Sequence, residues 1–196
     1  MKVAINARWV EGPYGGGSSF LKALISFLRD SGDEVEFELN QDRTYDLILL
    51  IDPRSRTANF TFGAWDVSRY RNVHPSVKVV HRINECDERK GTRFMNLLLR
   101  AANQEATLTI YIASWLTKLN LVSSSEKNHK VILNGVDSAI YFRKEPKFQP
   151  GKKLKLVTHH WGGNIKKGFD CYLYLDGLLF RREWQEIFEF TFIGNI

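Results

Sequence analysis

A glycine-rich loop near the amino end is the first part of the sequence with the residue types to bind a ligand. The loop Gly12–Ser19 contains four glycines and lies between a short β-branched run and an amphipathic stretch. A turn that leads into a helix presents free backbone N–H groups and the positive end of the helix dipole to an anion, and glycine lets the backbone approach that anion closely. We therefore assign Gly15, Gly16 and Gly17 to phosphate binding. A plain strand-to-helix turn is the alternative, because the spacing matches neither the dinucleotide fingerprint nor the P-loop.

Lysines and histidines gather around a second loop, near the carboxyl end. Lys166 and Lys167 come just before a predicted helix, where ammonium groups and free N–H groups together would hold a diphosphate. A solvated cationic loop is the alternative. His159 and His160 end the preceding strand, where parallel sheets bind ligands. Because neighbours on an extended chain point to opposite faces, we expect no metal between these two histidines.

Polar residues also end a strand in the first half of the chain. Arg82 and Asn84 lie at the end of the apolar run 77–83, where a pocket is expected. Two interpretations of this pair are open: the residues take part in catalysis, or they form salt bridges at the end of the strand. Cys86 has no evident triad partner, so we do not assign it as a nucleophile. The pair Asn134–Gly135 is, taken alone, a common turn dipeptide.

Apolar periodicity predicts the elements that position these residues. We expect a helix over 20–28, capped by Ser18 or Ser19, and a short helix capped by Ser114. A further helix is expected to bury Phe94, Leu97, Leu98, Ala101 and Ala102. The stretch 52–76 is too long for an uncovered loop and is expected to contain a helix. The remaining expected elements are strands over 2–6, 34–38, 45–51, 77–83, 108–112, 130–133, 153–158 and 188–193 and a helix over 169–179.

This alternation predicts an α/β protein with a Rossmann-like parallel sheet and helices on both faces. We assign residues 1–145 to that domain. The segment 143–152 has the composition of a linker, and the strand–helix rhythm then restarts. Residues 146–196 are therefore interpreted as a linker and the start of a second, incomplete Rossmann-like domain, whose β-α-β unit buries too little surface to stand alone.

Composition and charge exclude several classes of protein. The chain has 196 residues, 43% of them hydrophobic and 26% charged, which is ordinary for a globular protein. No apolar run approaches the roughly 18–20 residues that cross a bilayer, and two cysteines make no disulfide framework. The net charge of +6 favours anionic ligands, but no basic tail points to nucleic acid. We expect a cytoplasmic protein.

Four cations surround the predicted helix over 94–102. They are Arg89, Lys90, Arg93 and Arg100. Cations beside an apolar face are typical of helices that lie on a membrane surface, so a peripheral membrane contact is one alternative. We favour the other, an ordinary solvated face.

Taken in order, these pieces resemble the two-domain (GT-B) glycosyltransferases of family 4, the group 1 type. The resemblance covers essentially the whole chain. Its parts are Gly15-Gly16-Gly17 before a helix, Ile112-Ala113-Ser114, the run Val131 to Asp137, the restart at Leu154, then Lys167-Gly168-Phe169-Asp170, and Phe192-Ile193-Gly194. The specific part of the resemblance is the order of four features, namely Asn-Gly-Val-Asp, a linker, a strand and Lys-Gly-Phe-Asp.

The resemblance implies transfer of a hexose from a nucleotide-diphosphate sugar to a glycan or lipid-linked acceptor, with no metal or other cofactor. By analogy, amides near Gly16 and Gly17 would meet the donor diphosphate from the first domain, and Lys167 from the second. His159 and His160 stand where the family has a second diphosphate-binding cation.

The same resemblance gives roles to the remaining polar residues. Arg82 and Asn84 fall near the acceptor-side catalytic position, and Asn134 and Gly135 lie between the domains. The paired glutamates of the later second domain and the returning C-terminal helix are absent. We therefore expect a fragment that is inactive in isolation. A noncatalytic nucleotide-binding or scaffold fragment is an alternative, and a dinucleotide-dependent oxidoreductase is a second, although its fingerprint spacing fails.

Overall fold

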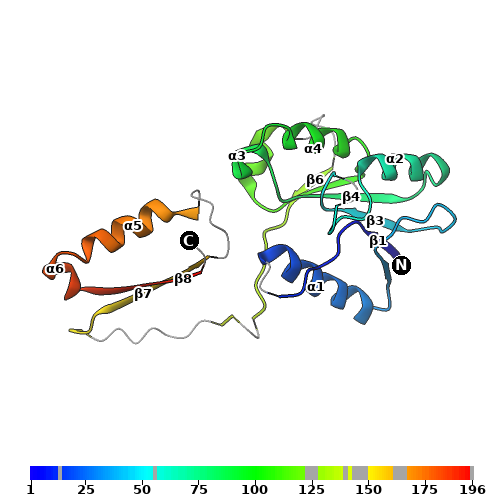
Figure 1. Ribbon diagram of the computed structural model, residues 1–196. Coiled ribbons are helices and arrows are strands. Elements are labelled where there is room, and N and C mark those ends of the chain that lie inside the picture. The colour runs from blue at the N-terminus through cyan, green and yellow to red at the C-terminus, as the bar shows by residue number, and fades with distance from the viewer. Residues whose placement is uncertain are drawn as a thin grey trace. The chain divides into compact units, whose positions relative to one another are not determined.

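The computed structural model describes residues 1–12, 15–54, 57–121, 128–138, 141–142, 150–160 and 167–194. The chain forms two compact units, Met1–Val136 and Asp137–Ile196 (Figure 1). The sequence-based boundary at residue 145 and most of the predicted linker, 143–149, lie outside the described residues. Each unit is described below by itself.

A six-stranded parallel sheet forms the centre of the first unit. Its strands are β1 (Lys2–Ile5), β2 (Glu34–Glu36), β3 (Leu47–Leu50), β4 (Lys78–Ile83), β5 (Leu108–Tyr111) and β6 (His129–Val131). Their order across the sheet is β2-β1-β3-β4-β5-β6, and every neighbouring pair is parallel. The chain leaves β1 toward one edge and returns on its other side as β3, so the strand order reverses between β1 and β3. In open parallel sheets, ligands bind at such a reversal, beyond the carboxyl ends of the strands.

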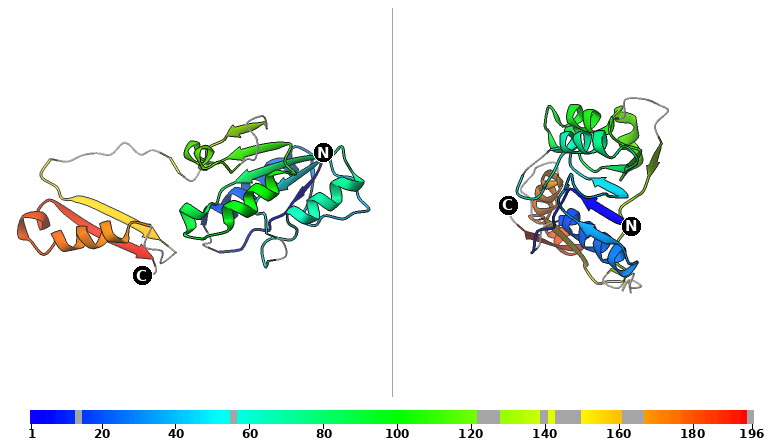
Figure 2. Two further views of the ribbon diagram at one scale, coloured as in Figure 1. Left: turned by 90° about the horizontal axis from the view of Figure 1, so that it is seen from above. Right: turned by 90° about the vertical axis from the view of Figure 1, so that its right-hand side faces the viewer.

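Helices cover both faces of this sheet, as predicted. Helix α1 (Gly15–Asp30) lies on one face, and α2 (Ala64–Val73) and α4 (Met95–Asn103) lie on the other (Figure 2). Strand residues alternate between the two layers: Ile5 packs with Ile25 of α1, whereas Ala4 packs with Val67 of α2. The first unit is thus an α/β layered structure of the Rossmann-like kind. Helix α2 confirms the helix expected within 52–76.

Two short helices complete the first unit, and both of the predicted serine caps are wrong. Helix α3 (Asp87–Lys90) precedes α4, and the 3-10 helix η1 (Ser114–Leu119) follows β5. Ser114 is the first residue of η1, whose N-cap is Ala113. Helix α1 begins at Gly15, so Ser18 and Ser19 lie within it, and Ser18 Oγ instead accepts a hydrogen bond from the Val10 N–H at 3.1 Å. The three glycines therefore belong to the helix itself.

The predicted buried face of α4 is also wrong in part. The buried residues of α4 are Met95, Leu99, Ala102 and Asn103. Phe94, Leu97 and Leu98 are exposed, and Ala101 is exposed as well. The stretch carries two apolar stripes at helical spacing, and periodicity alone does not say which of them the core takes.

The second unit is a small β-α-β arrangement. Strands β7 (Leu154–His160) and β8 (Phe188–Gly194) are parallel partners, joined through α5 (Phe169–Leu178) and α6 (Arg182–Gln185). Phe188 is the one buried residue among those described in this unit. So little burial is what a unit of this size provides. No helix among the described residues of the chain has the length and apolar character to span a membrane.

Candidate anion-binding site

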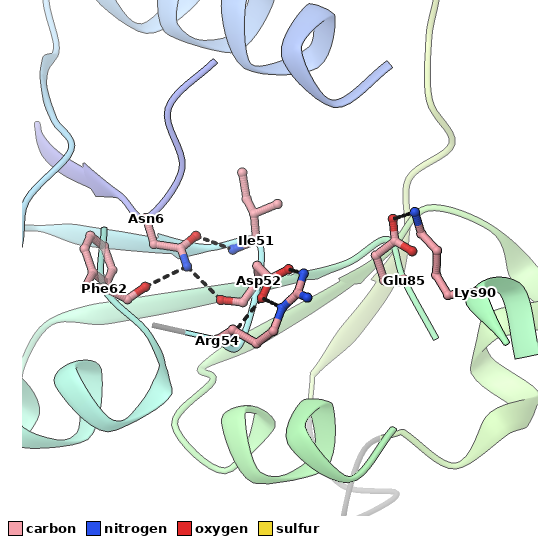
Figure 3. Close-up of polar contacts among 7 residues, drawn as sticks. All are labelled: Asn6, Ile51, Asp52, Arg54, Phe62, Glu85 and Lys90. Atoms are coloured by element: carbon pink, nitrogen blue, oxygen red, sulfur yellow. Dashed lines mark hydrogen bonds and ion pairs between the residues drawn. The ribbon is translucent and has the colours of Figure 1, made fainter. Parts of the chain in front are cut away.

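The fully buried Asn6 fixes the chain where the strand order reverses. Its Nδ2 donates to the backbone oxygens of Asp52 at 2.7 Å and Phe62 at 2.9 Å, and its Oδ1 accepts from the Ile51 N–H at 2.8 Å (Figure 3). One side chain thus joins the end of β1, the end of β3 and the segment that leads into α2. Because both amide groups are engaged with the backbone, we interpret Asn6 as a positioning residue for this edge of the sheet.

An ion pair follows β3 at the same edge. The Asp52 side chain is 5% exposed and accepts two hydrogen bonds from the Arg54 guanidinium, at 2.9 Å from Nε and 2.6 Å from Nη2 (Figure 3). The hydrogen bond with Asp52 is the main cause that raises the pKa of Arg54, and Glu85 adds a smaller Coulombic contribution. Such a bidentate pair holds both partners rigidly. Its charge is already balanced, so it offers little to an incoming anion.

Glu85, which follows β4, is only partly satisfied. Its Oε1 lies 3.5 Å from Lys90 Nζ (Figure 3), while its Oε2 is buried and accepts no hydrogen bond from the described residues. The neighbouring Asn84 is partly buried, and its backbone oxygen accepts from Arg89 Nη1 at 2.8 Å. This part of the edge is therefore acidic and hydrogen-bond accepting.

Arg82 is the buried cation of this edge and lies on the face of the sheet that carries α1. It is 5% exposed, its guanidinium carbon stands 3.8 Å from the centre of the Phe20 ring, and its Nη2 donates to Asn134 Oδ1 at 2.8 Å. Desolvation, helped by the charge of Arg89, lowers the pKa of Arg82 to about 10. Among the described residues, neither partner of Arg82 is an anion. The fold therefore holds a desolvated positive charge that an anionic ligand would stabilise.

The predicted glycines belong to the same helix, α1, as Phe20, which contacts Arg82. Phe20, which stacks on Arg82, follows Gly17 by less than one helical turn. The first turn of α1 contains no acidic residue, and the first four N–H groups of a helix have no acceptor within it. Glu11 lies just before this region, but Lys22 Nζ and Trp9 Nε1 hold its two oxygens at 2.9 and 2.7 Å.

The fold requires a glycine at only one of the three positions. Gly15 has φ of +52°, a left-handed conformation that L side chains rarely adopt. A Cβ atom at Gly16 or Gly17 would meet nothing within 4 Å, and both residues are exposed. Each glycine in a helix costs roughly 0.5–1 kcal/mol relative to alanine. Gly16 and Gly17 therefore destabilise the helix, and the packing of the described residues requires neither of them.

An apolar groove of about 370 Å³ runs beside α1 and has Arg82 in its wall. Leu24 and Leu28 of α1 line one side, and Val80 and Ile110 of the sheet line the other. Asn134 and Gly135, which follow β6, lie at the same groove, so the Asn134–Arg82 hydrogen bond gives this dipeptide a role beyond a plain turn.

Lys167 begins the helical part of the second unit. It is exposed, and it precedes Gly168, the N-cap of α5, whose φ of +91° is left-handed. The Lys167 backbone oxygen accepts from the Tyr172 hydroxyl at 3.0 Å, which ties the loop to the first turn of α5. Lys166 lies outside the described residues. Asp170 stands in the first turn of α5 and partly offsets the positive end of its dipole.

The two histidines of the second unit do not converge on one point. The His160 ring stacks at 6.0 Å on Phe169 of α5, whereas His159 is exposed and, by the strand alternation, points to the opposite face of the sheet. A Cβ at Gly194 would lie 1.8 Å from the His160 backbone oxygen, so only glycine fits at this end of β8. Of the pair, His160 is the one on the α5 side with Lys167. Among the described residues no group of three or more histidine, cysteine or acidic residues is placed to hold a metal.

Sequence reasoning missed the residues that organise the edge. Asn6 and Asp52 come directly after apolar strands, which is a usable signal, because buried parallel strands deliver their next residue to the ligand-binding edge. The stacking of Phe20 on Arg82 carried no such signal, since it joins residues 62 positions apart in the chain. Cys86 is buried and burial raises the pKa of its thiol, which makes it a poor nucleophile.

Comparisons with protein-family models and with curated protein sequences give no match to this chain.

Proposed function

We propose that this chain is part of a glycosyltransferase that transfers a hexose from a nucleotide-diphosphate sugar to a glycan or lipid-linked acceptor. The first turn of α1 in the amino-terminal unit supplies backbone amides to the donor diphosphate, and Lys167 is the diphosphate-binding residue that the resemblance assigns to the second unit. The proposal joins the sequence resemblance to the site's electrostatics, and it assigns no metal or other cofactor.

One observation carries the proposal: Arg82 is a buried cation without an anionic partner among the described residues, and it stands beside a helix whose first turn has two glycines that the fold does not need. A diphosphate would satisfy both features at once. Its oxygens would accept hydrogen bonds from the amides of Gly16 and Gly17, and its charge would offset that of the guanidinium.

The chemistry of sugar transfer requires this kind of site. Breaking the bond between the sugar and the diphosphate leaves negative charge on the leaving group while the sugar carbon becomes electron-poor. Fixed donors aimed at the leaving group stabilise that charge in the transition state without reorganising. In this proposal the α1 amides, the Arg82 guanidinium and, by the resemblance, Lys167 serve the diphosphate. Asn84 stays on the acceptor side of the edge, where Glu85 adds an acceptor for a sugar hydroxyl.

Two other functions remain as alternatives that one titration separates. A noncatalytic nucleotide-binding or scaffold fragment would bind a nucleotide diphosphate without preferring one that carries a sugar. A dinucleotide-dependent oxidoreductase would bind NAD, although the glycine spacing does not match the dinucleotide fingerprint.

The test is isothermal titration of the chain with UDP-glucose, GDP-mannose, UDP and NAD, using wild type, Lys167→Ala and Lys153→Ala. Lys153 is an exposed lysine of the same unit, so its variant is matched in charge. The proposal predicts binding of a sugar nucleotide, weakened about tenfold by Lys167→Ala and unchanged by Lys153→Ala, since a hydrogen bond to a charged group contributes about 1.5–3 kcal/mol. Binding of NAD alone would contradict the proposal, and equal effects of the two lysine variants would remove Lys167 from it.

A further inference from the structure

Helix α4 carries a second apolar stripe that faces away from the core. Phe94, Leu97 and Leu98 follow one another at helical spacing and are 71%, 63% and 40% exposed. We call these three residues the outer stripe. Leu99 and Met95, on the other side of the same helix, are almost fully buried. The sequence pattern favoured the outer stripe as the core face, and the structure leaves it uncovered.

The orientation of α4 is fixed by contacts at its start and along its inner side. The Asp87 carboxylate of α3 accepts hydrogen bonds from the backbone N–H groups of Met95 at 2.8 Å and Asn96 at 3.0 Å, and so caps the helix. Met95 and Leu99 belong to a buried cluster with Leu116 of η1. Rotating the helix to bury the outer stripe would break both sets of contacts. The outer stripe therefore belongs to the surface, on the layer opposite α1 (Figure 1).

Positive charge borders the outer stripe at both ends. Arg89, Lys90 and Arg93 are exposed before the helix, and Arg100 is exposed near its end, where its Nε donates to the Asn120 backbone oxygen at 3.0 Å. This last contact ties Arg100 to the end of η1, beside the carboxyl end of α4.

The carboxylates of this region are either hydrogen-bonded by their neighbours or mostly buried. Asp87 caps α4, Glu85 is 23% exposed and faces Lys90, and Glu88 is held by Asn96 Nδ2 at 3.0 and 3.1 Å. The more exposed charges around the outer stripe are thus mainly cationic.

We propose that the outer stripe inserts into the interfacial region of an anionic phospholipid bilayer, with the bordering arginines and lysine on the lipid headgroups. Large apolar side chains next to exposed cations are the composition of interfacial helices, and long cationic side chains reach the headgroups while their stems lie on apolar surface. A stable protein partner would bury about 800 Å² on each side, over roughly 20–30 residues, whereas the outer stripe consists of three large side chains on one short helix. This inference does not depend on the sugar-transfer proposal.

The experiment is co-sedimentation of the full chain with vesicles of phosphatidylglycerol and phosphatidylcholine in equal parts, and with vesicles of phosphatidylcholine alone. The variants are Leu97→Gln/Leu98→Gln, which removes apolar area from the outer stripe, and Arg89→Gln/Arg93→Gln, which removes charge. The matched controls are Phe27→Gln on α1, which is 67% exposed, and Phe180→Gln in the second unit, which is 85% exposed. Thermal unfolding checks that each variant is folded.

The proposal predicts binding to the anionic vesicles that falls at least about tenfold in Leu97→Gln/Leu98→Gln and about fivefold for each cation removed. Both controls bind as wild type. The proposal is overturned if wild type does not bind anionic vesicles, if neutral vesicles bind equally well, or if Phe180→Gln loses as much binding as the double leucine variant. Self-association in the absence of lipid that the leucine variant abolishes would also overturn it, because the outer stripe would then serve a second copy of the chain.

Discussion

Alanine substitutions along the glycine run separate the demands of the fold from those of a ligand. At Gly16 and Gly17 an added Cβ meets no atom within 4 Å. Alanine therefore fits the helix and lowers the conformational entropy of the unfolded chain. We expect Gly16→Ala and Gly17→Ala each to raise the free energy of unfolding by about 0.5 kcal/mol, and the double variant by about 1 kcal/mol. At Gly15, where φ is +52°, alanine is strained, and we expect a loss of about 1 kcal/mol.

Ligand binding should change in the opposite direction to stability at Gly16 and Gly17. A methyl group there stands where the diphosphate approaches the amides, so we expect the affinity for UDP to fall about tenfold in the double variant, although the protein is more stable. Urea unfolding followed by circular dichroism measures stability, and isothermal titration with UDP measures affinity. The reasoning is refuted if Gly16→Ala/Gly17→Ala binds UDP as wild type does, or if it is destabilised as much as Gly15→Ala.

Three further substitutions test other contacts. Arg82→Met removes a charge that burial desolvates, which lowers the pKa of Arg82 to about 10 and costs roughly 3 kcal/mol at 1.36 kcal/mol per pKa unit. We expect urea unfolding to show no loss of stability while UDP binding weakens, and a clear destabilisation with unchanged UDP binding would show that Arg82 is purely structural. Asn6→Ala leaves two backbone oxygens and one N–H without their buried partner. We therefore expect urea unfolding to show a free energy of unfolding that is lower by about 3 kcal/mol. A loss under 1 kcal/mol would mean that water replaces the amide. At Asp87, desolvation raises the pKa, but hydrogen bonds from Thr92 and from the backbone of Asn96 and Met95 outweigh it and hold the pKa of this carboxyl below its usual range. The stability that Asp87 contributes is therefore fully present above the unfolded pKa and is lost as the pH falls through the folded one; Asp87→Asn should flatten the acid limb of Tm against pH, and an unchanged limb would contradict the assignment.

The layout of the sheet could be predicted from the sequence because its central strands are short apolar runs between polar or glycine-containing segments, while β2 shows charged and apolar residues in alternation. The helix within 52–76 could be predicted from length alone, and α2 lies there. The inner side of α4 could not be predicted. Its sequence has apolar residues on two sides, and the choice depends on Asp87, which caps α4 from α3 across a turn that periodicity does not describe.

The candidate site was predictable to the extent that it follows strand ends and a glycine run. Arg82, Asn134 and the glycines were all identified, but as separate features. Arg82 lies beside α1 because its guanidinium stacks on the ring of Phe20, which belongs to that helix. Such contacts between distant residues arise only once the helix has packed on the sheet, so no local pattern contains them. The buried Asn6 was missed for the same reason, because its three partners come from two later segments.

The most direct test of the central claim is a two-dimensional ¹H–¹⁵N spectrum of the chain titrated with UDP. If a diphosphate binds at the first turn of α1, the backbone amides of Gly16 and Gly17 and the side-chain Nε–H of Arg82 shift together with one dissociation constant. The same titration of Arg82→Met shows smaller shifts at both glycines. Shifts confined to other parts of the chain, or glycine amides that do not move at saturating UDP, would contradict the account.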